Sequence, residues 1–146
     1  MKILFKKLRE DAVIPIKATA YSAGYDICSV SDEDIIIPSG EIRMIHTGIS
    51  AAPERKDTAL FVFPRSGLGS KYGITLANSV GVIDSDYRGE IMVPLINHGR
   101  ESFIVSSGMR IAQLVVMPVL SQEWIESEDL GETERGESGF GSSGLN

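Results

Sequence analysis

The sequence has little cysteine, little histidine and no long apolar run, and each shortage excludes a class of protein. The single cysteine, Cys28, cannot form an intramolecular disulfide, so a small secreted scaffold held together by disulfides is excluded. Together with Cys28, the two histidines His46 and His98 cannot complete a four-ligand Cys/His zinc site. Any bound metal should therefore be a hard cation held by oxygen.

Apolar segments long enough for a membrane are also missing. The longest uninterrupted one, Ala59 to Phe63, is far shorter than the roughly 20 residues that cross a bilayer. The opening Met1-Lys2-Ile3 shows no signal-peptide pattern. With the single cysteine, these features predict a soluble protein of a reducing compartment and no membrane partner. We expect a cytoplasmic location, without excluding a nuclear or viral origin.

Basic residues are in the minority. Fourteen Lys and Arg stand against twenty Asp and Glu, which gives a formal net charge of −6. Because general nucleic-acid binding depends on neutralising many phosphates, this balance argues against a nucleic-acid partner. It leaves open the binding of one small anion through a few local cations.

What is present indicates one compact all-β domain. Of the 146 residues, 42% are hydrophobic and 23% are charged. Fifteen glycines and six prolines separate short segments rich in β-branched and aromatic residues, and no helix longer than two turns is expected. The expected strands are residues 2–8, 35–37, 43–50, 59–63, 91–96, 103–106 and 111–119.

Two segments stand out from this pattern. Residues 91–96 are apolar on both faces, as expected where one face meets the core and the other meets a subunit interface, although Pro94 confines the segment to an edge or a bulge. From Gly131 onward, glycine and serine dominate. The composition predicts a β domain over residues 1–130 and a flexible C-terminal arm over residues 131–146.

Residues 64–73 are the first candidate for chemistry. They follow an apolar strand and combine two serines, two cations and three glycines. Glycine lets backbone N–H groups approach an anion, and Ser66 can cap a short helix whose N-terminus adds positive potential. The Walker order Gly-Lys-Ser/Thr is absent, so a phosphate-binding loop and a capped surface turn are equally compatible with the segment.

Residues 81–91 are the second candidate, with polar residues between two apolar ends. This pattern predicts a β-hairpin, with Gly89 able to take a positive φ. An Asp-Ser-Asp run is most often a solvated turn. Tyr87, three residues after Asp84, would nevertheless place a flat ring beside a carboxylate, which suits the holding of a sugar near a general base.

Two further segments carry polar groups in unexpected settings. Residues 108–114 bring Arg110 and Gln113 into an apolar strand, where a structural and a functional role are equally compatible with the pattern. The arm contains Arg135 and Phe140 among glycines and serines, and an aromatic ring in such a segment suggests that it docks on another surface.

Taken together, these segments resemble the five ordered motifs of the homotrimeric dUTP pyrophosphatases (dUTPases). The matching segments are residues 23–26, 64–68, 81–90, 108–113 and 135–144. Three positions depart from the family pattern. Ser138 replaces a usual glycine, Ser143 a usual threonine and Met109 a usual acidic residue. Of these, Ser138 could stiffen the arm and alter how readily it closes.

The resemblance implies a jelly-roll-like antiparallel β barrel or sandwich and a homotrimer with active sites at subunit boundaries. The implied reaction is hydrolysis of dUTP to dUMP and pyrophosphate, which limits uracil incorporation into DNA and supplies dUMP for dTMP synthesis. Asp84 is then the base that activates water for attack on the α-phosphorus. Tyr87 lies against the deoxyribose and excludes a 2′-hydroxyl.

The same resemblance implies Mg²⁺ as cofactor. Asp26 acts on it indirectly, through the water shell of the metal, or orients a neighbouring residue; a structural turn carboxylate is the alternative. Uracil is read by Asn78 and the backbone from Gly81 to Ile83, and Phe140 covers the base. The remaining implied substrate contacts are Arg65, Ser66, Gly67, Gln113, Arg135, Gly141, Ser142 and Ser143.

Two other functions are compatible with the sequence. The dCTP deaminase branch shares the fold, but it would not be expected to carry the arm over residues 135–144, and it releases ammonia instead of pyrophosphate. Alternatively, a nucleotide-binding trimer could act through a protein partner that docks on its tail. The retained Asp84 argues against an inactive enzyme without excluding such a second role.

Overall fold

The computed structural model describes residues 1–139, which form eleven strands and one short helix. None of the helical structure in that part of the chain has the length and apolar character needed to cross a bilayer. The elements are β1 (Ile3–Lys7), β2 (Tyr25–Cys28), β3 (Ile35–Ile37), β4 (Ile42–Ile45), β5 (Ile49–Pro53), β6 (Thr58–Pro64), α1 (Ser66–Tyr72), β7 (Ile74–Leu76), β8 (Gly81–Ile83), β9 (Val93–Asn97), β10 (Phe103–Val105) and β11 (Arg110–Pro118).

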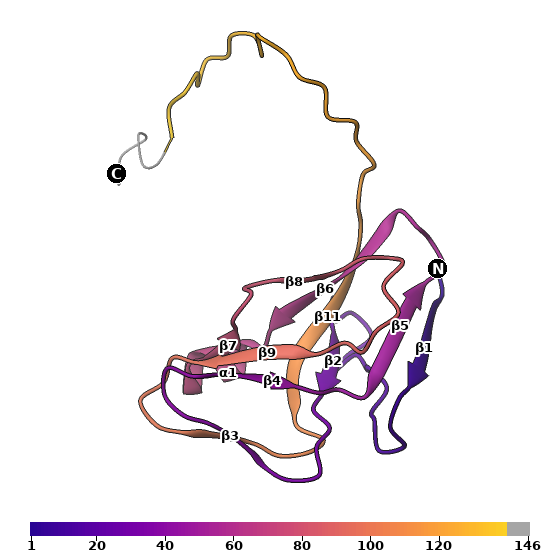
Figure 1. Ribbon diagram of the computed structural model, residues 1–146, viewed down its shortest axis with the longest axis vertical. Helices are drawn as coiled ribbons and strands as arrows, with labels where there is room; N and C mark the ends of the chain where they lie inside the picture. The colour runs from indigo at the N-terminus through magenta and orange to yellow at the C-terminus, as the bar shows by residue number, and fades with distance from the viewer. Residues whose placement is uncertain (140–146) are drawn as a thin grey trace.

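Antiparallel pairing groups the strands into four small sheets. The largest has the order β2-β11-β6-β8, and a three-stranded sheet has the order β4-β9-β7. The pairs β1-β5 and β10-β3 complete the fold. In Figure 1 the two larger sheets lie on different sides of one interior, and α1 lies beside β7. The prediction of an antiparallel all-β fold is therefore confirmed.

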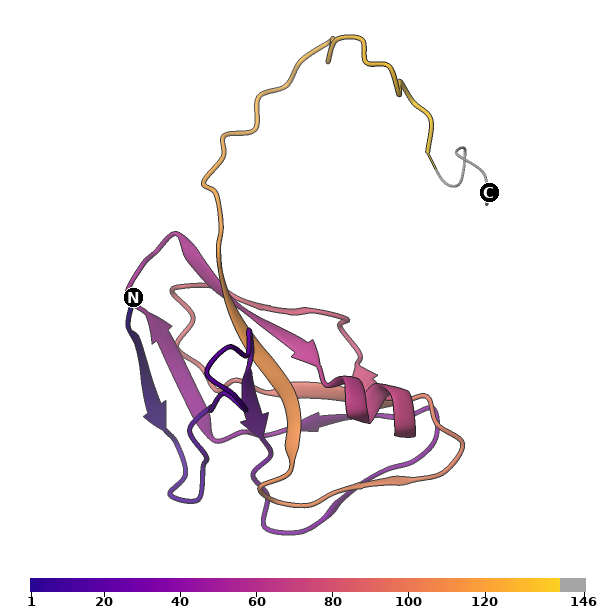
Figure 2. The same ribbon diagram turned by 180° about the vertical axis from the view of Figure 1, so that it is seen from behind.

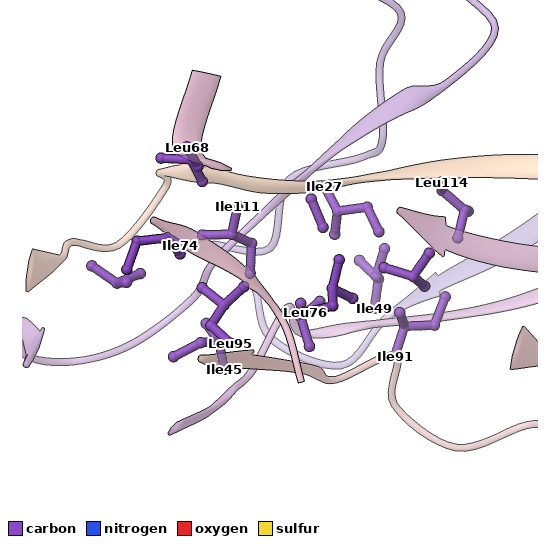
Figure 3. Packing of buried hydrophobic residues seen from close by; sticks show 14 of the residues in the cluster. Ile27, Ile45, Ile49, Leu68, Ile74, Leu76, Ile91, Leu95, Ile111 and Leu114 are labelled. Carbon is purple, nitrogen blue, oxygen red and sulfur yellow. The ribbon is translucent and has the colours of Figure 1, made fainter. Parts of the chain in front are cut away.

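One continuous apolar core joins the two larger sheets. Ile27 and Ile111 come from the four-stranded sheet, and Ile45 and Leu95 come from the three-stranded one; all four side chains are at most 1% exposed. Figure 3 shows the first pair facing the second across the interior. Burying each such side chain contributes roughly 1.5–3 kcal/mol, so this core holds the pocket-bearing strands in fixed positions.

The strand predicted over residues 43–50 is wrong in one respect, because it is two strands, β4 and β5. Gly48 lies between them with φ of +65°, and a Cβ there would lie 2.9 Å from the Cβ of Ala12. The chain therefore turns at Gly48 instead of continuing straight. Strands β2, β7 and β8, of four, three and three residues, are missing from the prediction.

Pro94 also differs from expectation, because it lies in β9, the middle strand of its sheet. Leu95 pairs with Leu76, the last residue of β7, so Pro94 lies just beyond the end of that neighbour. The Ala77 N–H still donates to the Pro94 carbonyl at 2.8 Å. A residue other than proline would point its N–H toward β7 here, but β7 has already ended at this position. The missing N–H of Pro94 therefore removes no hydrogen bond between β9 and β7.

The hairpin predicted over residues 81–91 is not formed. Strand β8 pairs with β6 in the four-stranded sheet, and residues 84–92 then pass to β9 in the other sheet; we call residues 84–92 the crossing segment. Gly89 does not have a positive φ. It is required for space instead, because a Cβ there would lie 2.3 Å from the Tyr87 hydroxyl.

The chain leaves the folded body after β11. Residues 119–139 form no strand or helix, and Figures 1 and 2 show them running away from the sheets as an extended thread. Large apolar side chains along it, Leu120, Trp124 and Leu130, are 87–93% exposed. Val119 still contacts the segment before β6, where its N–H donates to the Asp57 carbonyl at 2.9 Å, whereas residues 120–138 are all exposed.

Candidate active site

A first pocket lies where β2, β6, β11 and α1 meet. It has a volume of about 390 Å³. Its lining includes five residues predicted for the site, together with Ser22 and Lys71. The five are Asp26, Arg65, Ser66, Gly67 and Gln113.

The start of α1 places Arg65 at the pocket. Arg65 is the N-cap, with extended backbone (φ −91°, ψ 129°), and its carbonyl accepts from the N–H groups of Leu68 and Gly69. Ser66 is the first helical residue, so the prediction that it caps the helix is wrong. At the other end, Gly73 stops the helix with φ of +70°.

Asp26 pairs with two arginines, of which Arg65 lines this pocket. Arg65 Nε donates to Asp26 Oδ1 at 3.0 Å, and Arg110 Nη1 donates to Oδ2 at 3.1 Å. The Asp26 side chain is only 11% exposed, whereas Arg110 is half-exposed. One carboxylate between two guanidinium groups leaves a net positive charge, and N–H donors not taken by Asp26 can reach an anion.

Gln113 and Gly24 complete the wall of the pocket. Gln113 Nε2 donates to the Pro64 carbonyl at 3.0 Å, which ties β11 to the end of β6. A Cβ at position 24 would lie 2.6 Å from Gln113 Oε1, so glycine makes room for this amide. The Gln113 side chain is thereby held in one orientation at the pocket.

Residues 1–139 contain no group of three or more His, Cys, Asp and Glu that could hold a metal ion. Both oxygens of Asp26 already accept hydrogen bonds from arginines. Mg²⁺ commonly keeps several waters and binds substrate phosphates with one or two carboxylates. A Mg²⁺ at this pocket would therefore take most of its ligands from water and from oxygens of a bound substrate.

A second pocket, of about 270 Å³, lies between β8, the crossing segment and β9. Its wall is mostly apolar, with side chains such as Val62, Leu76 and Met92, and it also includes Glu90. Five residues predicted for the site line it. These are Asn78, Gly81, Ile83, Asp84 and Tyr87.

Local contacts fix the polar groups of the second pocket. A Cβ on Gly81 would lie 3.3 Å from Asn78 Nδ2, so glycine lets this amide lie close to the backbone. The Tyr87 N–H donates to the Asp84 carbonyl at 3.1 Å, and the Tyr87 hydroxyl donates to the Glu90 carbonyl at 3.1 Å. The Asp84 side chain is exposed and makes no hydrogen bond or ion pair within residues 1–139.

The remaining predicted residues belong to neither pocket as described. Arg135 lies on the extended thread, where its Nε donates to the Ser138 carbonyl at 2.8 Å. Phe140, Gly141, Ser142 and Ser143 lie outside the described residues. No residue lines both pockets.

Sequence reasoning misses two contributors. Arg110 stands out in the sequence only as a cation in an apolar strand, and Glu90 only as one of three acidic residues in its segment. The contact between Arg110 and Asp26 depends on the pairing of β11 with β2, which places Arg110 opposite Cys28 and leaves no signal in the local sequence. No local sequence signal indicates the role of Glu90.

The two pockets together suit a small phosphorylated molecule. The first offers cationic groups for phosphate, and the second offers an amide, a carboxylate and an aromatic ring in a mostly apolar wall. The chain belongs to the dUTPase family, whose model matches residues 10–144. The predicted family resemblance is thereby confirmed.

Individual relatives agree with this assignment. The deoxyuridine 5′-triphosphate nucleotidohydrolase of Nautilia profundicola is 49% identical over 144 residues, which cover 99% of each chain. The structure of Staphylococcus bacteriophage 80alpha dUTPase with dUPNHPP is similar at a TM-score of 0.88 and 28% identity, covering 99% of each chain.

A third relative concerns a metal. A mutant dUTPase from phage phi11 of S. aureus, described with the coordination of a structural Mg(II) ion, has a TM-score of 0.79. It is 22% identical, and the match covers 89% of this chain and 99% of that one. At this identity the likeness shows the fold alone.

Proposed function

We propose that this protein hydrolyses dUTP to dUMP and pyrophosphate, which limits uracil incorporation into DNA and supplies dUMP for dTMP synthesis. The observation that carries the proposal is the pairing of an arginine-containing pocket with a second pocket that holds the free carboxylate of Asp84 beside Tyr87. The full-length relative from N. profundicola, which bears the name of this activity, supports the same reaction.

Asp84 acts as the general base. It takes a proton from water, the water oxygen bonds to the α-phosphorus, and the bond from that phosphorus to the leaving pyrophosphate oxygen breaks. Such a base contributes about 10²–10⁴-fold to the rate. The exposed position of Asp84, at the rim of the second pocket, suits this role because no partner within residues 1–139 occupies its oxygens.

The first pocket holds the triphosphate. Arg65, Ser66, Gly67 and Gln113 contact the phosphate oxygens, and Asp26 positions Arg65 for this purpose. Mg²⁺ bound to the phosphates would neutralise part of their charge and orient the α-phosphorus. Phosphoryl transfer depends mainly on such positioning and electrostatic stabilisation.

The second pocket selects uracil and deoxyribose. Asn78 and the backbone at Gly81 and Ile83 face the uracil edge, and Tyr87 lies against the sugar. Cytosine reverses donor and acceptor at two ring positions, so it would leave polar groups unpaired at roughly 1–3 kcal/mol each. The pocket therefore refuses dCTP through hydrogen bonding.

A homotrimer would bring the two pockets together. The two pockets share no lining residue. If the first pocket of one subunit adjoins the second pocket of another, one dUTP molecule contacts the phosphate-binding groups of the first and the base- and sugar-binding groups of the second. Ile42 and Met44 on β4 are about half-exposed, which supplies apolar surface for a subunit contact. The arm from residue 131, with Arg135 and residues 140–143, would then close over the bound nucleotide.

Release of pyrophosphate from separate nucleotides tests the proposal. The protein is incubated with Mg²⁺ and dUTP, UTP or each of the four DNA-building dNTPs. We expect pyrophosphate from dUTP, with every other nucleotide far slower. Ammonia release from dCTP without pyrophosphate would favour the deaminase alternative, and no reaction with any nucleotide would contradict both enzymes.

A further inference from the structure

The side chain of Glu90, in the crossing segment, is hydrogen-bonded to the loop of residues 46–48 (the 46–48 loop). Glu90 Oε1 accepts from the N–H of Gly48 at 2.8 Å and from the N–H of Thr47 at 3.2 Å. Glu90 Oε2 lies 2.8 Å from His46 Nδ1. Three successive residues thus direct polar groups at one carboxylate.

The 46–48 loop is itself fixed by the fold. Gly48 combines a positive φ with close packing against Ala12 and Val30, where a Cβ would lie 2.9 and 3.1 Å from their side-chain atoms. Thr47 is 1% exposed, and its hydroxyl donates to the Ile91 carbonyl. The two N–H groups therefore form a pre-arranged anion-binding turn. The crossing segment is attached to this loop through both the Ile91 carbonyl and the Glu90 side chain.

Glu90 is also joined to Tyr87, on the pocket side. Its backbone carbonyl accepts the Tyr87 hydroxyl at 3.1 Å, and Gly89 leaves the space that this hydroxyl needs. The side chain of Glu90 is thus hydrogen-bonded to the 46–48 loop, and its backbone carbonyl is hydrogen-bonded to the Tyr87 hydroxyl. Tyr87 and Glu90 both line the second pocket.

Charge strengthens this attachment. Burial disfavours the ionised form of Glu90, but hydrogen bonds from His46, Gly48 and Thr47 outweigh that cost, so the pKa of Glu90 lies below its ordinary value. Hydrogen bonds to an ionised carboxylate are roughly twice as strong as neutral ones.

We infer that Glu90 is a positioning residue for sugar selection, acting through Tyr87. By fastening the crossing segment to the 46–48 loop, it keeps the Tyr87 ring where a 2′-hydroxyl would collide with it. This role rests on the proposed hydrolysis of dUTP. Its experimental consequence is a change in the preference for dUTP over UTP.

Three variants test the role in turnover. Glu90→Ala should lower the ratio of kcat/KM for dUTP to that for UTP by about tenfold or more, since small displacements of a positioning group are costly. Glu90→Gln keeps an oxygen for the Thr47 and Gly48 N–H groups, so the ratio should change less than about threefold. Glu33→Ala, which removes an exposed carboxylate before β3, should leave it unchanged. An unaltered ratio in Glu90→Ala would overturn the inference.

A double-mutant cycle separates action through Tyr87 from a general structural effect. In a Tyr87→Ala background, Glu90→Ala should produce no further loss of sugar preference, because the group that it positions is already absent. The same loss in both backgrounds would show that Glu90 acts independently of Tyr87. Tyr87→Phe removes only the hydroxyl bond to Glu90 and should also lower the ratio; a full native ratio in this variant would contradict the role even if Glu90→Ala failed to fold.

Hydrogen exchange without nucleotide tests the attachment even if dUTP proves not to be the substrate. Glu90→Ala should exchange faster in peptides that cover both the 46–48 loop and the crossing segment, while β6 and β11 stay protected. Glu90→Gln should resemble the native protein. Native-like protection of the crossing segment in Glu90→Ala would overturn the positioning role, whatever the substrate.

Discussion

The two pockets are built from different chemistry but share one arrangement. In the first, the largely buried carboxylate of Asp26 holds Arg65 by an ion pair; in the second, the carboxylate of Glu90 holds the segment that carries Tyr87. Asp84, by contrast, has no side-chain partner within residues 1–139. The comparison indicates that the paired carboxylates position other groups, whereas the free one is available for proton transfer.

The largest effect should follow from neutralising the free carboxylate. Asp84→Asn keeps shape while removing the base, so kcat should fall about 10²–10⁴-fold with KM little changed. Asp86→Asn, two residues away on the same segment, is the matched control and should remain active. Steady-state pyrophosphate release measures both. If Asp84→Asn keeps more than about a tenth of the native kcat, the base is another residue and Asp86 is examined next.

The next largest effect should come from the first pocket. Arg65→Ala removes charged hydrogen bonds to phosphate, so KM for dUTP should rise roughly 10–100-fold. Arg43→Ala removes an exposed arginine on β4 that pairs with Glu41, and it should leave KM unchanged. A native KM in Arg65→Ala would place the phosphates elsewhere.

The C-terminal arm should matter for turnover but not for the stability of the fold. A chain ending at Gly131 should lose about tenfold or more in kcat, as expected when a closing segment completes a site. Its melting temperature should stay near the native one, because the preceding thread is largely exposed. Calorimetry and turnover measured on the same preparation test both statements, and full activity would contradict the closing role.

The smallest effect concerns pH and stability. Since the folded state lowers the pKa of Glu90, its ionised form adds stability above the unfolded value of about 4.3, and that stability is lost as pH falls through the folded value. Glu90→Gln should therefore unfold slightly more easily near pH 7, by about 1 kcal/mol, because it keeps the acceptor but loses the charge, and the difference should shrink below about pH 4. Urea denaturation at fixed protein concentration measures it. An equal difference at both pH values would mean that charge is not involved.

Much of the site is readable from local sequence. The segments around Arg65 and Asp84 carry their chemistry within a few residues, and the structure places them in the first and second pockets. The interior positions of β6, β9 and β11 follow from short apolar segments in the same way. Local pattern therefore indicates the all-β class and most lining residues.

Contacts between distant residues are not readable. Asp26 meets Arg110 across 84 positions, and Glu90 meets Gly48 across 42, so neither pair leaves a local pattern. The predicted hairpin is wrong for the same reason, because the partner of β8 is β6 and not the strand that follows. Pro94 is likewise predicted to lie at an edge or a bulge. That prediction is wrong because β7 ends at Leu76, so a middle strand can carry a proline without losing a hydrogen bond to β7.

Complementation between two variants that are both nearly inactive at dUTP concentrations well below the native KM tests the central claim that the two pockets of one substrate site come from different chains. Arg65→Ala and Asp84→Asn are refolded together in equal amounts, and mixed trimers are verified by native mass spectrometry. In random mixing, half the first pockets and half the second pockets are intact, so about a quarter of the sites should regain activity if each site draws on two chains. No recovery in verified mixed trimers would place both pockets of a site on one chain and contradict the account.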